Sequence, residues 1–262
     1  MNSDQKRTPA LFVGHGSPMN ALQDNKYTRA LREFGKSLRK PRGVLSISAH
    51  WLTPQVSVTH MLRPKTLHDF YGFPDQLYQI QYPAPGDPIL AEEVRSLLKD
   101  EQVVLDDTDW GLDHGTWSVL RHLFPAADIP VVQLGISIHE QPEFHLNVGR
   151  KLIGLRDRGV MLLGSGNIVH NLNRICWEED ADPFQWAIDF DEAVKNSLIQ
   201  RDFAQLLTAP NSSPAGRLSV PTPEHYFPLH YITGASILDD RLEFICEGIQ
   251  NASISMRTFV FR

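Results

Sequence analysis

The chain has 262 residues, of which 42% are hydrophobic and 21% charged, and this composition suits a globular α/β domain with a large core. Its formal net charge of -6 and the lack of long basic runs exclude an electrostatic surface for nucleic acid or anionic membranes. The sequence predicts no secretory signal and no membrane span, and Cys176 and Cys246 lack CxxC spacing, so we expect a reduced, cytoplasmic protein.

In the first part of the chain, apolar runs and helical spacing alternate. The expected strands are 10–14, 43–49, 55–61, 102–105 and 130–136. The expected helices are 26–38, 87–99, 116–123 and 142–157. The helix at 87–99 has the clearest start, because Asp87 can cap it and Pro88 occupies its first helical position.

The second part continues the alternation after Arg158-Gly159, a helix end that leads into a strand at 160–164. We expect helices at 184–199 and 202–207, a Pro/Ser/Gly loop at 208–223, a helix from 225 and two final strands. No linker divides the chain. The prediction is one α/β domain over 1–262, with a central mixed, largely parallel sheet flanked by helices and a flexible N-terminus at 1–8.

Four of the 11 histidines end short stretches that read as a strand or turn running into a loop: His15, His50, His170 and His225. The first three follow apolar or small residues typical of buried parallel strands. Ligands of α/β sheets bind outside the carboxyl ends of the strands. The pattern therefore predicts one metal site at an end of the sheet, with neighbouring Gly, Ser or Ala leaving space for an ion. The alternative is that each histidine satisfies a local hydrogen bond.

Residues 62–86 form a long segment rich in proline, glycine and aromatic residues, among them His68, Tyr71 and Tyr82. A loop of this length without regular structure is usually functional or disordered, and so many aromatics argue against disorder. The segment is interpreted either as a packed lid over an aromatic ligand or as a rigid surface loop that its aromatics pin to the core.

The second unusual segment is Asp109 to Trp117, in which Gly111 and Gly115 bracket Asp113 and His114. A carboxylate near a histidine can set its tautomer and basicity, which would suit His114 to transfer a proton beside a metal. The alternative is a helix-entry loop in which Asp113 caps backbone amides and His114 faces water.

Seven motifs occur in order: GHGSPMN, SAHW, TLHDFYGFP, YPAPG, DHGTW, SGNIVHN and TPEHYFPL. Together, from about residue 9 to the C-terminus, they resemble the bacterial 4,5-DOPA extradiol dioxygenases of the class III extradiol superfamily. The resemblance implies a single extradiol-dioxygenase-like catalytic domain that opens the ring of a catechol such as L-DOPA, by 4,5-cleavage to 4,5-seco-DOPA, with O₂. With the charge and composition above, no nucleic-acid or membrane partner is expected, and the protein is expected to be a monomer or small homo-oligomer.

The resemblance also implies roles for individual residues. The metal ligands would be His15, His50, His170 and His225, and the catalytic proton-transfer groups His114 and His170. His68, Tyr71 and Asp113 are expected to contact the substrate, and His170 is assigned both roles.

The cofactor implied is one divalent metal ion, with Zn²⁺ as the bound species and Fe²⁺ as the requirement for oxygen chemistry. Many superfamily members use two histidines and one carboxylate. Here the third-ligand region reads Glu224-His225, and the resemblance selects His225. An all-histidine site suits zinc as well as iron. Two other functions stay open: a zinc-dependent hydrolase, or a non-enzymatic binding protein on the same scaffold.

Overall fold

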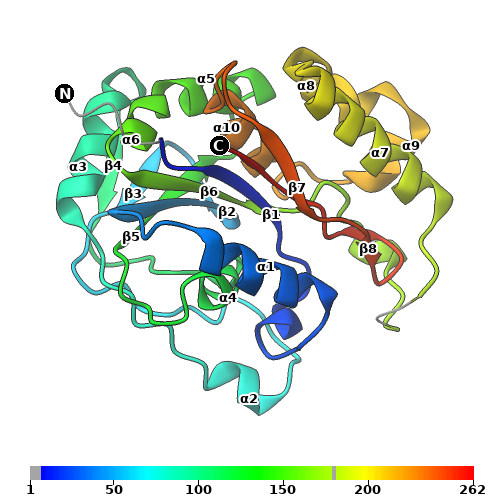
Figure 1. The fold of residues 1–262 in the computed structure, drawn as a ribbon, viewed down its shortest axis with the longest axis horizontal. Coiled ribbons are helices and arrows are strands. Elements are labelled where there is room, and N and C mark those ends of the chain that lie inside the picture. The colour runs from blue at the N-terminus through cyan, green and yellow to red at the C-terminus, as the bar shows by residue number, and fades with distance from the viewer. Residues whose placement is uncertain (1–6, 179–180) are drawn as a thin grey trace.

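An eight-stranded sheet forms the centre of the molecule in a computed structural model that describes residues 7–178 and 181–262 (Figure 1). Its strands are β1 (Ala10–Gly14), β2 (Gly43–Thr53), β3 (Ser57–Thr59), β4 (Val104–Asp106), β5 (Val131–Ser137), β6 (Val160–Gly166), β7 (Leu242–Cys246) and β10 (Thr258–Phe261). A separate two-stranded sheet pairs β8 (Ile249–Gln250) with β9 (Ile254–Ser255).

The strand order in the large sheet is β4-β3-β5-β2-β6-β1-β10-β7. The four strands β5, β2, β6 and β1 run parallel to one another. At one side β10 is antiparallel to β1, and at the other β3 is antiparallel to β5. The predicted α/β fold with a mixed, largely parallel sheet is confirmed.

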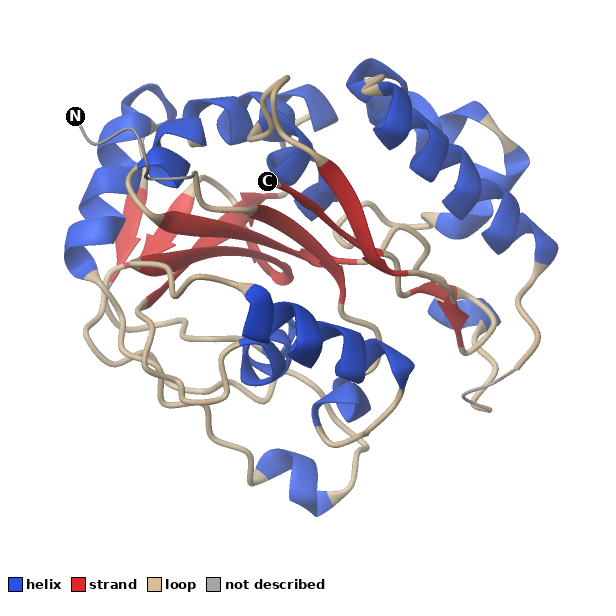
Figure 2. Cartoon of the chain, viewed as in Figure 1, coloured by secondary structure: helices blue, strands red, loops and turns tan. Residues whose placement is uncertain are grey.

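Helices cover both faces of the sheet (Figure 2). They are α1 (Lys26–Ser37), α2 (Asp75–Tyr78), α3 (Pro88–Leu97), α4 (His114–Leu123), α5 (Pro142–Lys151), α6 (Ile153–Asp157), α7 (Gln185–Gln200), α8 (Phe203–Ser212), α9 (Pro214–Ser219) and α10 (Phe227–Gly234), with 3₁₀ turns η1 (Pro18–Ala21), η2 (Lys99–Glu101) and η3 (Leu172–Arg174). Helices α1 and α4 pack on one face, and α3, α5, α6 and α10 pack on the other, as Figure 1 shows.

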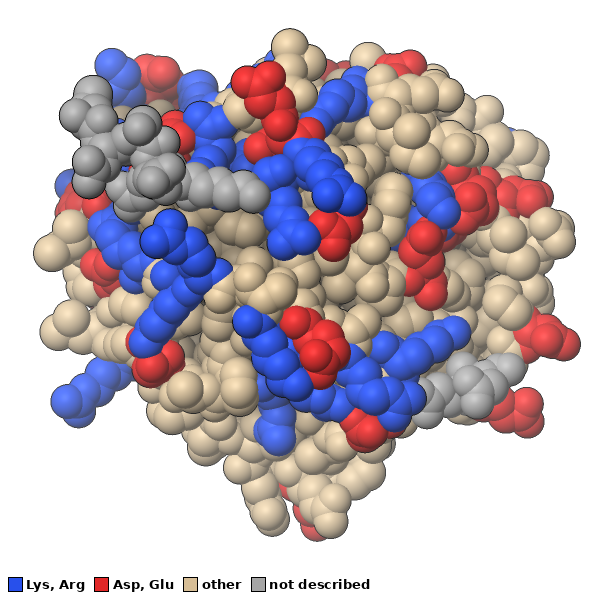
Figure 3. Space-filling model, viewed as in Figure 1, with Lys and Arg blue, Asp and Glu red and all other residues tan. Residues whose placement is uncertain are grey.

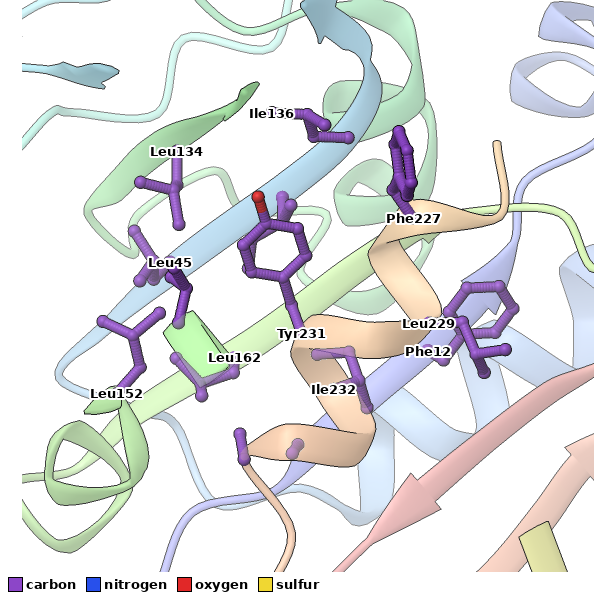
Figure 4. Close-up of a cluster of buried hydrophobic side chains, with 14 of the residues drawn as sticks. Phe12, Leu45, Leu134, Ile136, Leu152, Leu162, Phe227, Leu229, Tyr231 and Ile232 are labelled. Atoms are coloured by element: carbon purple, nitrogen blue, oxygen red, sulfur yellow. The ribbon is translucent and has the colours of Figure 1, made fainter. Parts of the chain in front are cut away.

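Alternation along the strands divides the buried side chains between two cores. In β1, Leu11 belongs to the core under α1 and α4, whereas Phe12 belongs to the core under α10. Figure 4 shows the second core, in which Tyr231 and Ile232 of α10 lie among apolar side chains of the sheet such as Leu162. Burying one such side chain contributes about 1.5–3 kcal/mol, so both faces hold the strands in place.

Several predicted elements differ from the structure. The single helix expected at 142–157 is two helices, α5 and α6, and four strands, β7 to β10, occur where two final strands were expected. The expected loop at 208–223 contains the end of α8 and all of α9. Helix α9 begins there because the Ser213 side chain accepts a hydrogen bond from the Gly216 N–H and Pro214 occupies the first turn. Strand β2 extends to Thr53, so His50 lies within a strand and not beyond its end.

Residues 1–6 of the N-terminus that was expected to be flexible lie outside the described residues. The two that follow are tied to the fold: Arg7 Nε donates to Asp157 Oδ1 at 2.7 Å, and Thr8 Oγ1 donates to the Val160 carbonyl at 2.5 Å.

Charged side chains of both signs are intermingled on the face of the molecule that Figure 3 shows. Arg42 and Glu93, for example, form an ion pair with a 2.9 Å contact. Across residues 7–178 and 181–262, no helix combines the length and the apolar character that a membrane crossing requires. Cys176 and Cys246 are both free thiols.

Candidate metal centre

The four predicted metal ligands and His114 converge at one end of the sheet. The ring centroids of His15, His50 and His225 are 5.1–5.3 Å apart in each pair. His114 lies 3.9 Å from His50, and His170 lies 3.5 Å from His225, again between ring centroids. Donor atoms of His15, His50 and His114 all lie within 4.8 Å of one another, as do those of His170, Glu224 and His225. The alternative, in which each histidine only satisfies a local hydrogen bond, does not explain why their rings converge.

Breaks in regular pairing bring these side chains together. His15 follows directly after the last residue of β1. His50 lies in the part of β2 where the register with β5 shifts between Ile47 and Leu52. His225 lies in the turn before α10, where its carbonyl accepts a hydrogen bond from the Asn167 N–H at 2.8 Å.

Two glycines permit close approach at this end of the sheet. A Cβ at Gly115 would lie 2.5 Å from Ser48 Oγ and 3.0 Å from His50 Cδ2. A Cβ at Gly166 would lie 2.2 Å from the His225 carbonyl oxygen. These two glycines therefore make room for neighbouring protein atoms.

A hydrogen-bond chain identifies the protonated nitrogen of His15. Ser165 Oγ donates to the Gly115 carbonyl at 2.6 Å, so its single proton is already used. The same oxygen lies 2.9 Å from His15 Nδ1 and must accept there. His15 Nδ1 therefore carries the proton, and the free lone pair is on Nε2.

The rings of His50 and His225 are oriented in the same way by carboxylates. His50 Nδ1 is 3.4 Å from Asp69 Oδ2, and His225 Nδ1 is 3.1 Å from Glu224 Oε1. A carboxylate accepts hydrogen bonds, so these contacts favour a proton on each Nδ1 and a lone pair on each Nε2. Glu224 also accepts a hydrogen bond from Thr222 Oγ1 at 2.8 Å.

The Nε2 atoms of His15 and His50 face each other at 3.2 Å. Two lone pairs at this distance repel unless a cation lies between them. Two nitrogens bound to one zinc ion at roughly 2.0–2.1 Å would be about 3.3 Å apart in a tetrahedral arrangement. The donor set therefore fits a divalent ion.

Burial keeps these histidines in the neutral form that binds metal. Desolvation, and secondarily the neighbouring imidazoles, hold the pKa values of His15, His50 and His225 well below the usual value. Burial also lowers the pKa of His170 to about 4, with His114 adding to the shift. At pH 7 the lone pairs of all four are available.

His114 begins α4 and contacts a carboxylate from the 62–86 segment. Its Nδ1 lies 2.9 Å from Asp69 Oδ2, and its backbone N–H donates to Asp69 Oδ1 at 2.8 Å. Burial alone would raise the pKa of Asp69. The hydrogen bond from His114 and the nearby imidazoles lower this pKa by more than burial raises it, so Asp69 is ionised at neutral pH. His114 thus has an oriented ring with Nε2 free.

Asp113 occupies the N-cap of α4 and is fully buried. Its carboxylate accepts hydrogen bonds from the Thr116 N–H and from Gln133 Nε2. Burial, followed by the charge of Asp69, raises the pKa of Asp113 to about 6. The predicted substrate contact of Asp113 remains a prediction, because the structure accounts for its carboxylate through protein partners.

The two other predicted substrate contacts lie in the 62–86 segment, which is mostly loop except for α2. His68 Nε2 donates to the Ile80 carbonyl at 3.0 Å, and its ring packs 5.7 Å from that of Trp117. Tyr71 is 92% exposed. Their contacts with substrate remain predictions.

Sequence reasoning missed two residues of this centre. Ser165 ends up beside His15 because β1 and β6 are parallel neighbours, with Val13 opposite Ser165. Asp69 lies within the 62–86 segment, and no role was predicted for it. The available signals were the Ser-Gly ending of the strand 160–166 and the His68-Asp69 pair. Neither is part of a helical or strand-like pattern of apolar residues, which is what the predictions relied on.

Comparisons with known proteins agree with this geometry. Residues 9–261 match the family model LigB, described as the catalytic LigB subunit of aromatic ring-opening dioxygenase. The chain is 47% identical to 4,5-DOPA dioxygenase extradiol of Escherichia coli K12 over 95% of this chain and 93% of that protein. It is 35% identical to the protein of the same name from Beta vulgaris, over 100% of this chain and 99% of that one. A crystal structure of an uncharacterized protein from Escherichia coli K12 superposes with a TM-score of 0.85 at 42% identity, covering 98% of this chain and 100% of the other.

Proposed function

The chain belongs to the LigB family of extradiol ring-opening dioxygenases, and from this premise we propose that it opens the ring of a small catechol such as L-DOPA by 4,5-cleavage to 4,5-seco-DOPA. The observation that carries the proposal is the inward-facing set of neutral imidazoles, three of which have their Nδ1 beside an oxygen acceptor. The names of the relatives supply the substrate class.

We propose His15, His50 and His225 as the ligands, each through Nε2. Their oriented rings support this set, and Glu224 then serves to orient His225. An ion so held supplies positive charge that favours loss of the catechol protons and, if it is Fe²⁺, electron exchange with O₂ that Zn²⁺ does not provide.

His170 is better suited to proton transfer than to binding the same ion as His225. The two rings are stacked, with centroids 3.5 Å apart and only 8° between their planes. Imidazole lone pairs lie in the ring plane, so two rings stacked in this way do not direct their lone pairs at one point. A neutral His170 beside the ligands can accept a substrate proton and return it later.

His114 is the second proposed proton-transfer group. The Asp69 contact keeps the proton on Nδ1, so Nε2 is the atom that would accept a catechol proton. Asp69 would then stabilise the imidazolium that forms. The edge of Phe70 packs on the His114 ring at 5.5 Å, which limits rotation of the ring.

The test is reconstitution of the metal-stripped protein with Fe²⁺ or Zn²⁺ under anaerobic conditions, followed by L-DOPA with and without O₂. The Fe²⁺ form in air should consume about one O₂ per catechol and yield a yellow semialdehyde product. Equal activity of the Zn²⁺ form, or an Fe²⁺ form that works without oxygen, would favour a hydrolase.

A further inference from the structure

Asp69 joins the 62–86 segment to two imidazoles at once. Its Oδ2 lies 2.9 Å from His114 Nδ1 and 3.4 Å from His50 Nδ1. The Asp69 side chain is only 18% exposed, although its main chain lies at the surface. The carboxylate therefore points from a surface loop into the metal centre.

The neighbours of Asp69 hold one half of this loop against α4. Trp117 Nε1 donates to the Leu67 carbonyl at 2.7 Å, and the Leu67 N–H donates to the Leu112 carbonyl at 2.8 Å. Directly after Phe70 the chain leaves this surface, because Tyr71 is 92% exposed and Gly72 adopts a positive φ of 80°, and it is buried again at Leu77. The loop thus has an anchored part, residues 65–70, followed by an exposed turn at Tyr71 and Gly72.

A carboxylate hydrogen-bonded to the outer nitrogen of a metal-binding histidine fixes its tautomer and increases its basicity. The Asp69 carboxylate lies within ion-pair distance of His50 Nδ1, at 3.4 Å, while its hydrogen bonds to His114 hold residues 65–70 in position. If a bound ion makes the His50 ring more positive, the attraction between that ring and the Asp69 carboxylate increases, and the attachment of the loop becomes stronger.

We propose that Asp69 is a positioning residue that couples residues 65–70 to the metal centre, so that metal binding and ordering of this segment favour each other. Such coupling is reciprocal: the factor by which the ordered loop raises metal affinity equals the factor by which metal favours the ordered loop. The inference rests on the part of the proposed function that places a metal at His50, and not on the identity of the substrate.

The competing explanation is that Asp69 only satisfies the start of α4, since it accepts the His114 backbone N–H at 2.8 Å. In that case its loss would lower stability without altering the metal. The two explanations differ in metal affinity and in how the loop responds to metal.

The experiment uses the full chain with Asp69→Asn, which retains an acceptor but removes the charge, and Asp69→Ala, which removes both. The matched control is Asp107→Asn, because Asp107 Oδ1 contacts His60 Nδ1 at 2.7 Å in a second carboxylate–histidine pair. His60 follows β3, which is antiparallel to β5, so it lies at the opposite edge of the sheet from His50. Circular dichroism of the metal-free proteins checks that each variant is folded.

Three quantities are measured: affinity for Zn²⁺ by competition with a chelator, the visible spectrum of the Co²⁺ form, and amide hydrogen exchange of residues 65–70 with and without Zn²⁺. Asp69→Asn should bind Zn²⁺ about 10–100-fold more weakly and alter the Co²⁺ bands. In the wild type and Asp107→Asn, Zn²⁺ should slow exchange of residues 65–70, and in Asp69→Ala this slowing should disappear.

Zinc affinities within about twofold of wild type in both Asp69 variants would overturn the proposal, as would weaker affinity with an unchanged response of the loop. These outcomes are independent of ring opening. A protein that cleaves no catechol but shows the coupling would refute the proposed substrate alone. An active dioxygenase without the coupling would refute the role of Asp69 alone.

Discussion

The Ser165 hydroxyl is placed between the His15 ring and the Gly115 carbonyl, accepting from His15 Nδ1 at 2.9 Å and donating to the carbonyl at 2.6 Å. One hydroxyl thereby sets which nitrogen of His15 faces the centre. The hydroxyl comes from β6, and the histidine from the end of the neighbouring strand β1.

We therefore expect Ser165→Ala to weaken metal binding about 10–100-fold, because His15 can then adopt the other tautomer. Isothermal titration with Zn²⁺ measures this. Ser46→Ala is the control, since Ser46 is equally buried and its hydroxyl lies 2.8 Å from Thr116 Oγ1, with no histidine contact. Equal metal affinities in the two variants would show that the hydroxyl does not orient His15.

Replacement of His15 or His50 by Ala should remove the bound metal and leave the fold intact, because both lie at the end of the sheet and not in either hydrophobic core. Elemental analysis tests the loss of metal, and circular dichroism tests whether the fold is retained. His122→Ala serves as the control, since His122 is also buried but its Nε2 is bonded to the Asn20 carbonyl at 2.9 Å. Metal at the wild-type level in both ligand variants would refute the site.

His114→Ala should retain the metal and slow turnover of L-DOPA about 10²–10⁴-fold, the usual loss when an acid/base group is removed. Steady-state rates with matched metal content give the comparison. Loss of the metal instead would make His114 a ligand, an outcome for which its donor atom lies close enough to those of His15 and His50. Full activity would show that His114 transfers no proton in the reaction and only begins α4.

Two buried histidines that are not among the proposed metal ligands, His145 and His230, should make the protein less stable in acid. Burial lowers the pKa of His145 to about 4 and that of His230 to about 3. Both pKa values rise to about 6.5 on unfolding, so the unfolded state binds more protons at pH 5. Stability is therefore full above about pH 6.5 and falls as the pH is lowered, by about 2 kcal/mol per histidine at pH 5.

Urea unfolding of the metal-free protein at about pH 7.5 and about pH 5 measures the total loss of stability, to which the buried histidines of the metal centre also contribute. His230→Leu removes one titrating group and should reduce the difference between the two pH values by about 2 kcal/mol. His139→Leu is the control, because His139 is exposed. An unchanged pH difference in His230→Leu would show that His230 is protonated without cost in the folded state.

The sequence predicted the elements that depend on local signals. Asp87 caps α3 as expected, with its side chain accepting a hydrogen bond from the Leu90 N–H, and Gly159 takes the positive φ expected before β6. The apolar run before His15 placed that residue directly after β1. Capping and alternation are properties of a few neighbouring residues, so they can be read without knowledge of the fold.

Other features depend on partners distant in sequence. Asp69 lies in a loop without periodicity, and its contact with His114 spans 45 positions. The break in β2 at His50 arises from its pairing with β5, which the sequence of β2 alone does not reveal. Helix α9 was missed for a different reason: Ser213 and Pro214 were interpreted as loop residues although they form a start signal for a helix.

The turn that carries residue 225 has several main-chain contacts that do not involve the side chain at this position. The His225 carbonyl accepts from the Asn167 N–H, Gly166 packs against that carbonyl, and the Tyr226 N–H donates to the Pro223 carbonyl at 2.9 Å. None of these contacts uses the imidazole, whose own contacts are with Glu224 and the His170 ring. His225→Glu would exchange a three-nitrogen donor set for two nitrogens and a carboxylate, the combination suited to Fe²⁺. We therefore expect this one substitution to change the metal preference of the centre while the main-chain hydrogen bonds of the turn are kept.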